Sequence, residues 1–165
     1  MSSVMPIAVR PANTPYQRLG GHEAVVRLVD AFYHAMDTRR DARTIRAMHE
    51  ADLTRTKAVL VKYLCEWLGG EHLYSDEFGA PALRRRHHRF DIDEAARDAW
   101  MACMRQALTE TCADKVLRSE LEAAFWKMAD YLKNTEAPKR QRGPRLAAAT
   151  PSLPGATEPL HGARR

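Results

Sequence analysis

Seven histidines occur in the 165-residue chain, and two of them, His87 and His88, are adjacent in a strongly basic segment. Imidazole can take up a proton near neutral pH or donate a ring-nitrogen electron pair to a transition metal. Adjacent residues on a helix point about 100° apart, so only one histidine of this pair can bind a given metal ion. The segment therefore predicts at most one imidazole ligand.

The other histidines and the three cysteines do not supply the rest of a zinc site. Zinc needs several nitrogen or sulfur ligands at suitable spacing, and Cys65, Cys103 and Cys112 form no Cys-x-x-Cys pair. A lone axial imidazole favours heme iron over zinc. A histidine in an arginine-rich turn is, however, more often a solvated surface residue. The odd cysteine count argues against a disulfide framework, so we expect buried or half-buried thiols.

The elements that must position such a ligand are helical. Between Thr14 and Thr135 the apolar residues recur at helical spacing, and no stretch alternates long enough to predict a strand. Thr14, Pro15 and Gln17 form a capping box with proline at the first helical position. This pattern predicts a short helix that ends at Gly20–Gly21, within an all-α domain.

Four longer segments repeat their apolar residues at three- and four-residue steps, as amphipathic helices do. Aromatic residues on such stripes usually belong to the core. The stripes are Val25, Leu28, Val29, Phe32, Tyr33 and Met36; Thr56, Val59, Leu60, Tyr63, Leu64 and Trp67; Trp100, Met104, Ala107 and Leu108; and Leu117, Leu121, Phe125, Met128 and Leu132.

Polar signals predict where several helices begin or end. A polar break at 38–41 precedes a short helical piece that ends near Met48–His49. Asp91, as a carboxylate cap with a glutamate three residues later, predicts the start of the third long helix. The last helix is expected from about Asp114 to Lys133.

The segment 71–89 lacks a sustained period and contains Gly79 and Pro81. Glycine and proline interrupt regular structure. We therefore expect mostly loop here, with one brief helical turn before His87.

The excess positive charge lies in one terminal segment. The chain has 26 Lys and Arg residues against 21 Asp and Glu residues, and the segment after Pro138 holds six of these cations and one acid. This proline- and alanine-rich segment lacks the apolar surface that would offset the entropy of ordering. We expect a flexible extension at 1–13, a folded domain at 14–136 and a basic, disordered tail at 137–165. A neutral body does not favour nucleic-acid binding, although the tail leaves a weak contact with an anionic surface open.

Targeting signals are absent from the sequence. The longest apolar runs are only a few residues, as at 58–61, whereas a membrane span needs about 20. Residues 1–10 contain no signal-peptide core. The sequence thus predicts a cytoplasmic protein without a membrane contact.

The motifs, in their order, resemble group II of the truncated hemoglobins over residues 16–133. The most specific part is the Arg-His-x-x-Phe-x-Ile segment followed by Arg-Asp-Ala-Trp. The resemblance implies a two-over-two helical sandwich around heme b. The matching motifs are Tyr16-x-x-Leu19-Gly20-Gly21, Phe32-Tyr33, Met48-His49, Trp67-Leu68-Gly69-Gly70, Tyr74, Leu83-Arg84-x-Arg86-His87-x-x-Phe90-x-Ile92 and Arg97-Asp98-Ala99-Trp100.

On the proximal side, the resemblance implies that His87 is the ligand of heme iron and that Arg86 faces a heme propionate. A guanidinium and a carboxylate form a charge-assisted hydrogen bond. The chain departs from the family here, because His88 replaces a small residue and Arg89 replaces a proline. Ala80 stands where the family commonly has a histidine.

On the distal side, the resemblance implies that Tyr33, Trp100 and His49 stabilise a bound gas by hydrogen bonds. Thr56 and Leu60 match the distal-helix positions that face the gas. Further residues match heme-contacting or core positions, the first two as weaker propionate partners: Arg84, Tyr74, Phe32, Tyr63, Leu64, Phe90 and Met104.

The resemblance implies reversible binding of oxygen and other diatomic gases, including carbon monoxide and nitric oxide. Several hydrogen-bond donors also suit redox chemistry, so nitric oxide detoxification or a peroxidase-like reaction is the alternative. No flavin or nicotinamide module is recognisable, so an enzyme would need a separate reductase. The resemblance alone also leads us to expect a homodimer. A third hypothesis, a helical interaction domain that uses its basic tail, predicts salt-sensitive binding that is lost on deletion after Pro138.

Overall fold

The computed structural model describes residues 13–135, and every regular element in that range is a helix. The all-α prediction is therefore confirmed for this range. The expected extension before Asn13 and the expected tail at 137–165 lie outside the described residues. The elements are α1 (Pro15–Leu19), α2 (Gly21–Thr38), the 3-10 helix η1 (Arg40–Ala42), α3 (Arg43–Ala47), α4 (Thr54–Trp67), α5 (Ser75–Phe78), α6 (Leu83–His87), α7 (Glu94–Thr111) and α8 (Lys115–Tyr131).

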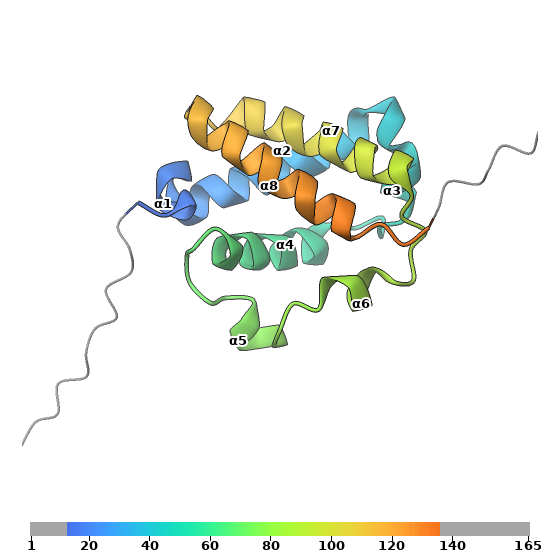
Figure 1. The fold of residues 1–165 in the computed structure, drawn as a ribbon, viewed down its shortest axis with the longest axis horizontal. Helices are drawn as coiled ribbons and strands as arrows, with labels where there is room; N and C mark the ends of the chain where they lie inside the picture. The colour runs from blue at the N-terminus through green and yellow to red at the C-terminus, as the bar shows by residue number, and fades with distance from the viewer. Residues whose placement is uncertain (1–12, 136–165) are drawn as a thin grey trace, which may run out of the picture.

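The longest helices form the body of the molecule. Helix α2 packs against both α4 and α7, and α7 packs against α8. In Figure 1, α4 lies below this group, and α5 and α6 lie below α4. Within the described range, no helix combines the length and the hydropathy of a membrane span.

The core lies where α2, α4, α7 and α8 meet. The predicted stripe of α2 is buried throughout, which confirms that pattern. Cys65, Cys103 and Cys112 are free and buried, as expected, and burial raises the pKa of each thiol. The largest side chains with almost no exposure are Phe32, Phe125, Leu28, Met36, Leu64, Met101, Met104, Leu108 and Leu117.

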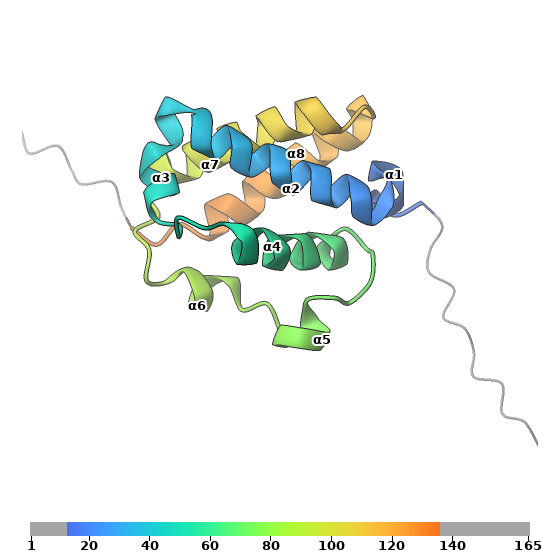
Figure 2. The same ribbon diagram turned by 180° about the vertical axis from the view of Figure 1, so that it is seen from behind.

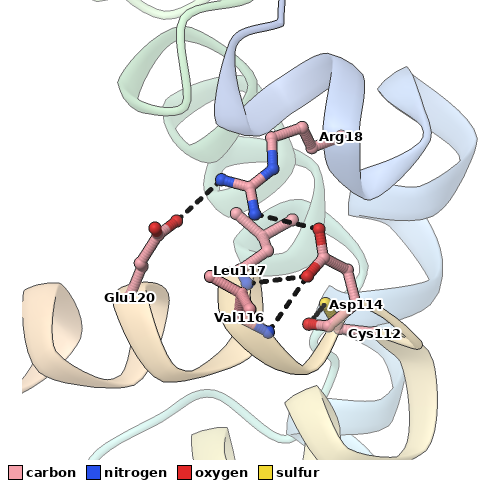
Figure 3. Close-up of polar contacts among 6 residues, drawn as sticks. All are labelled: Arg18, Cys112, Asp114, Val116, Leu117 and Glu120. Atoms are coloured by element: carbon pink, nitrogen blue, oxygen red, sulfur yellow. Dashed lines mark hydrogen bonds and ion pairs between the residues drawn. The ribbon is translucent and has the colours of Figure 1, made fainter.

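Helix α1 starts as the sequence predicts and is joined to α8 by ion pairs. The Thr14 side chain accepts a hydrogen bond from the Gln17 backbone, and the Gln17 side chain accepts one from the Thr14 backbone. Figure 3 shows Arg18 between Asp114, at 2.9 Å, and Glu120, at 2.7 Å.

The two carboxylate oxygens of Asp114 bind different partners. One carboxylate oxygen pairs with Arg18, and the other accepts hydrogen bonds from the backbone N–H groups of Val116 and Leu117 at 3.0 and 2.9 Å (Figure 3). These backbone bonds, followed by the Arg18 contact, hold the pKa of Asp114 below its usual range. The carboxylate thereby caps α8.

Helix α7 begins two residues later than predicted. Its N-cap is Asp93, which accepts a hydrogen bond from the Ala96 N–H at 2.8 Å, and the predicted cap Asp91 lies outside the helix. The reason is a contact distant in sequence. The N–H of Ile92 donates to the Asn134 side chain at 2.9 Å, and the carbonyl of Ile92 accepts the Asn134 N–H at 3.0 Å.

The segment 71–89 contains more helix than predicted. Helix α5 follows Tyr74, and the N–H groups of Tyr74 and Ser75 donate to Glu66 of α4 at 3.1 and 2.8 Å. This carboxylate satisfies the first amides of a helix that has no side-chain cap of its own. The support comes from another helix, so the local pattern could not reveal it.

Candidate functional site

A cavity of about 650 Å³ lies between α4, α6, α7 and α8, with α3 and the residues after it at one side. A cavity of this size suits a small molecule or a cofactor. Its lining is mainly apolar. The lining residues on α4 and α8 and just beyond are Arg55, Thr56, Val59, Leu60, Tyr63, Met128, Ala129 and Leu132.

His87, the last residue of α6, lines this cavity with one ring nitrogen already engaged. Its Nδ1 lies 2.8 Å from the carbonyl oxygen of Leu83, one turn earlier. A carbonyl only accepts hydrogen bonds, so Nδ1 carries the proton and Nε2 of the neutral ring carries the lone pair. No described residue forms a hydrogen bond to Nε2.

His49, which follows α3, has the same arrangement. Its Nδ1 lies 2.8 Å from the carbonyl oxygen of Ile45, and the ring also lines the cavity. Burial lowers the pKa of His49, which favours the neutral ring. A neutral ring bonded in this way cannot donate a hydrogen bond from Nε2. The neutral ring thus offers an acceptor at Nε2, and the expected role of His49 as a donor to a gas stays a prediction.

Two other side chains are donors that face the cavity. No described residue accepts a hydrogen bond from the Tyr33 hydroxyl or the Trp100 indole N–H. Burial raises the pKa of Tyr33, so the phenol stays protonated. The described range holds no fully buried side-chain nitrogen or oxygen that lacks a partner, so these two groups must be open to the cavity. An acceptor in the cavity would satisfy both.

Aromatic contacts fix the two donors. The rings of Tyr33 and Trp100 each pack against Phe32, with centroids 5.0 and 5.1 Å away. His49 contacts Tyr33 edge to face at 5.7 Å, and Phe125 lies 5.8 Å from Trp100. The donors are therefore held by packing rather than by hydrogen bonds.

Arg86 and Arg84 differ in where they point. The Arg86 guanidinium lines the cavity, lies 5.6 Å from the Tyr74 ring centroid and donates to the carbonyls of Pro81 and Phe78 at 3.1 and 3.3 Å. Arg84 instead donates to the carbonyl of Tyr131 at 3.1 Å and does not line the cavity. Arg86 has no carboxylate partner among the described residues.

The structure brings most of the predicted site residues to one cavity. Four of them do not line it. Arg84 donates to the carbonyl of Tyr131, the last residue of α8, and Phe32, Leu64 and Met104 are fully buried in the core. The predicted residues that do line it are His87, His49, Tyr33, Trp100, Thr56, Leu60, Arg86, Tyr74, Tyr63 and Phe90.

Asn134 is a positioning residue that the sequence did not indicate. Its side-chain N–H₂ donates to the carbonyls of His87, at 3.3 Å, and Phe90, at 2.9 Å. Its side-chain oxygen accepts the Ile92 N–H. The end of α8 therefore holds the segment that carries His87, and no local pattern signals such a contact.

Other lining residues were also missed or were interpreted only as core. Met128 belongs to the α8 stripe, and its sulfur accepts a hydrogen bond from the Tyr63 hydroxyl at 3.3 Å. Arg55 and Arg89 line the cavity without an ion pair to a described residue. No group of three His, Cys, Asp or Glu side chains in the described range could hold a metal ion. A metal bound here would need most of its ligands from a non-protein group.

Comparison with known proteins identifies the family that shares this sequence and fold. The family model described as bacterial-like globin matches residues 14–135. The group 2 truncated hemoglobin YjbI of Bacillus subtilis (strain 168) is 33% identical over 129 residues, which cover 78% of this chain and 95% of that protein.

Solved structures show the same fold. The group II 2-on-2 hemoglobin from the plant pathogen Agrobacterium tumefaciens is 37% identical with a TM-score of 0.74, covering 79% of this chain and 100% of that one. The cold-adapted truncated hemoglobin of the Antarctic marine bacterium Pseudoalteromonas haloplanktis is 36% identical with a TM-score of 0.73, covering 74% and 99%. The described helices thus have the two-over-two arrangement that the sequence predicts.

Proposed function

The chain belongs to the bacterial-like globin family as a group II truncated hemoglobin, and we propose that it holds heme b with His87 as the axial protein ligand of the iron. Membership makes it a heme-binding protein for oxygen and other diatomic gases. When bound, heme supplies an iron atom at which such gases bind reversibly. The protein's own residues set the surroundings of that atom.

The observation that carries the proposal is the state of the His87 ring. The hydrogen bond from Nδ1 to the Leu83 carbonyl fixes a ring that lines the cavity, and no described residue forms a hydrogen bond to its Nε2 atom. A carbonyl partner on the remote nitrogen orients a metal-binding imidazole and makes it more basic. Asn134, which bonds the His87 carbonyl, fixes the backbone as well.

The proposed donors to a bound gas are Tyr33 and Trp100. Both have a hydrogen to donate, neither has a described acceptor, and both line the cavity. Donors fixed before the ligand arrives need no rearrangement, and in an apolar cavity they act more strongly than in water. Thr56 and Leu60 of α4 line the same cavity, whose surface is mainly apolar.

Arg86 is the proposed partner of a heme carboxylate. Its guanidinium lines the cavity and has no carboxylate partner among the described residues, so the charge is available. The Tyr74 ring beneath it restricts its orientation. Tyr63 and Phe90 are proposed as heme contacts, because both line the cavity.

A redox enzyme is the second candidate function. The observation that favours it is that two donors, rather than one, face the same apolar cavity. Nitric oxide detoxification and a peroxidase-like reaction both use polar groups of this kind. A separate reductase and a homodimer remain predictions from the sequence resemblance.

Titration of the heme-free protein with hemin tests the main proposal. We expect saturation at one heme per chain and an absorption spectrum of the reduced protein that changes with oxygen or carbon monoxide and returns when the gas is removed. Failure to retain stoichiometric heme would contradict the proposal. Rapid mixing with nitric oxide or peroxide tests the second candidate, which is excluded if turnover is no faster than that of free heme.

A further inference from the structure

His49 matches His87 in its chemistry as well as in its place beside the cavity. Each ring donates from Nδ1 to the carbonyl four residues earlier, at 2.8 Å in both cases. In the neutral form of either ring, Nε2 therefore carries the lone pair, and no described residue forms a hydrogen bond to it. The lining of the cavity therefore includes two rings that can act as Lewis bases.

The surroundings of His49 favour a base over a hydrogen-bond donor. No described carboxylate forms an ion pair with the ring, so no described negative charge stabilises its protonated form. The neighbouring cation Arg46 is itself engaged by Asp37, at 2.5 Å, and by the carbonyl of Glu50, at 2.9 Å. The adjacent Tyr33 ring packs edge to face with the imidazole, and no hydrogen bond joins the two side chains.

The two histidines approach the cavity from different elements. Figures 1 and 2 both show α3, which precedes His49, and α6, which ends in His87, at the same end of the molecule. Both rings line the same cavity.

We propose that in the absence of gas the Nε2 atom of His49 binds the heme iron at the axial position that His87 leaves open. The proposal rests on the proposed function, because it assumes His87 as the first protein ligand. A gas must then displace His49. Residues 48–53 between α3 and α4 are not helical, so the segment that carries His49 can move without unwinding a helix.

Spectra of the gas-free, heme-loaded protein test this proposal directly. Optical absorption of the reduced protein and electron paramagnetic resonance of the ferric protein distinguish a six-coordinate, low-spin iron from a five-coordinate, high-spin one. We expect a low-spin wild type, a high-spin His49→Ala variant and a low-spin His88→Ala variant. His88 is the matched control, because it is exposed and bonds its own turn through the Arg85 carbonyl.

Carbon monoxide binding supplies an independent readout. If internal ligation leaves about a tenth of the reduced protein open, His49→Ala raises the apparent affinity for carbon monoxide about tenfold. In the wild type, the observed rate of carbon monoxide binding should reach a plateau at high carbon monoxide concentration, because dissociation of His49 becomes limiting. In His49→Ala this rate should rise in proportion to the carbon monoxide concentration.

The outcomes separate the two proposals. A high-spin wild type with stoichiometric heme overturns the role of His49 and leaves the proposed function intact. A low-spin spectrum that persists in His49→Ala has the same two consequences. A low-spin spectrum that persists in His49→Ala but is lost in Tyr33→Phe would assign the axial position to the phenol instead. Loss of stoichiometric heme from the wild type overturns both proposals.

Discussion

The body of α2, α7 and α8 and the arm of α5 and α6 are held in place by different forces. The body buries its largest side chains completely, as Leu28, Phe125 and Met104 show. Helices α5 and α6 contain no buried residue, and their tethers are hydrogen bonds such as those of Glu66 to the start of α5 and Arg86 to the Phe78 carbonyl. The fold therefore depends on apolar burial in the body, whereas the position of His87 depends on polar tethers.

The largest effect is expected from a substitution in the body. Phe125→Ala removes a fully buried ring that packs on Trp67 and Trp100, and should lower the free energy of unfolding by about 3–5 kcal/mol. Urea denaturation of the heme-free protein measures it. Val116→Ala, on the exposed side of the same helix, is the control and should change stability by less than about 0.5 kcal/mol. Equal losses in the two variants would contradict the comparison.

The next effect should fall on the arm alone. Asn134→Ala removes the bonds to the carbonyls of His87 and Phe90 and the acceptor for Ile92. If these bonds together contribute about 1.4 kcal/mol to heme retention, heme should transfer to a heme-free acceptor protein about tenfold faster. Asn134→Asp keeps the acceptor and loses the donors, so it should be intermediate. If Asn134→Ala instead lowered the free energy of unfolding of the heme-free protein and left the rate of heme loss unchanged, Asn134 would support the body rather than the arm.

A smaller effect is expected at the junction of α1 and α8. Asp114→Ala removes both the helix cap and the Arg18 ion pair and should lower the melting temperature by a few degrees. Asp114→Asn keeps a capping oxygen and loses only an exposed ion pair, so it should lower the melting temperature less. Thermal denaturation compares the two. An asparagine variant as unstable as the alanine variant would show that the charge, rather than the cap, matters.

The smallest effect concerns pH. Burial lowers the pKa of His49 below its ordinary 6.5. Below that pH, the imidazole is therefore protonated more readily in the unfolded chain than in the folded chain. This contribution to stability is complete above about pH 6.5 and is lost as the pH falls below that value. His49→Gln should therefore make the heme-free protein less sensitive to acid over that interval. Denaturation series at several pH values measure the difference, and identical slopes would contradict it.

The sequence could predict the body because its signals are local. The capping box at Thr14 and the stripe of α2 depend on neighbouring residues, and both are confirmed. The start of α7 was misplaced because Asn134, distant in sequence, holds Ile92 outside the helix. Helix α5 was missed for a similar reason, since Glu66 supplies its N-terminal acceptor.

The site was predictable only in part. The family motifs named His87, Tyr33 and Trp100, and the structure places all three at one cavity, although their roles stay predictions. A helical stripe identifies the inward side of a helix but cannot tell a core contact from a cavity wall. Met128 therefore went unrecognised as a lining residue, while Met104, on a similar stripe, is fully buried.

The most direct test of His87 as the axial ligand is an absorption spectrum of the reduced, carbon monoxide-bound protein, compared with His87→Gly before and after addition of imidazole. With carbon monoxide bound on one side of the iron, the spectrum would report the protein ligand on the other side, and the test does not depend on the proposal for His49. We predict that His87→Gly loses heme or shows a shifted spectrum, and that imidazole restores the wild-type spectrum. A wild-type spectrum from His87→Gly with stoichiometric heme and no imidazole would show that another residue binds the iron.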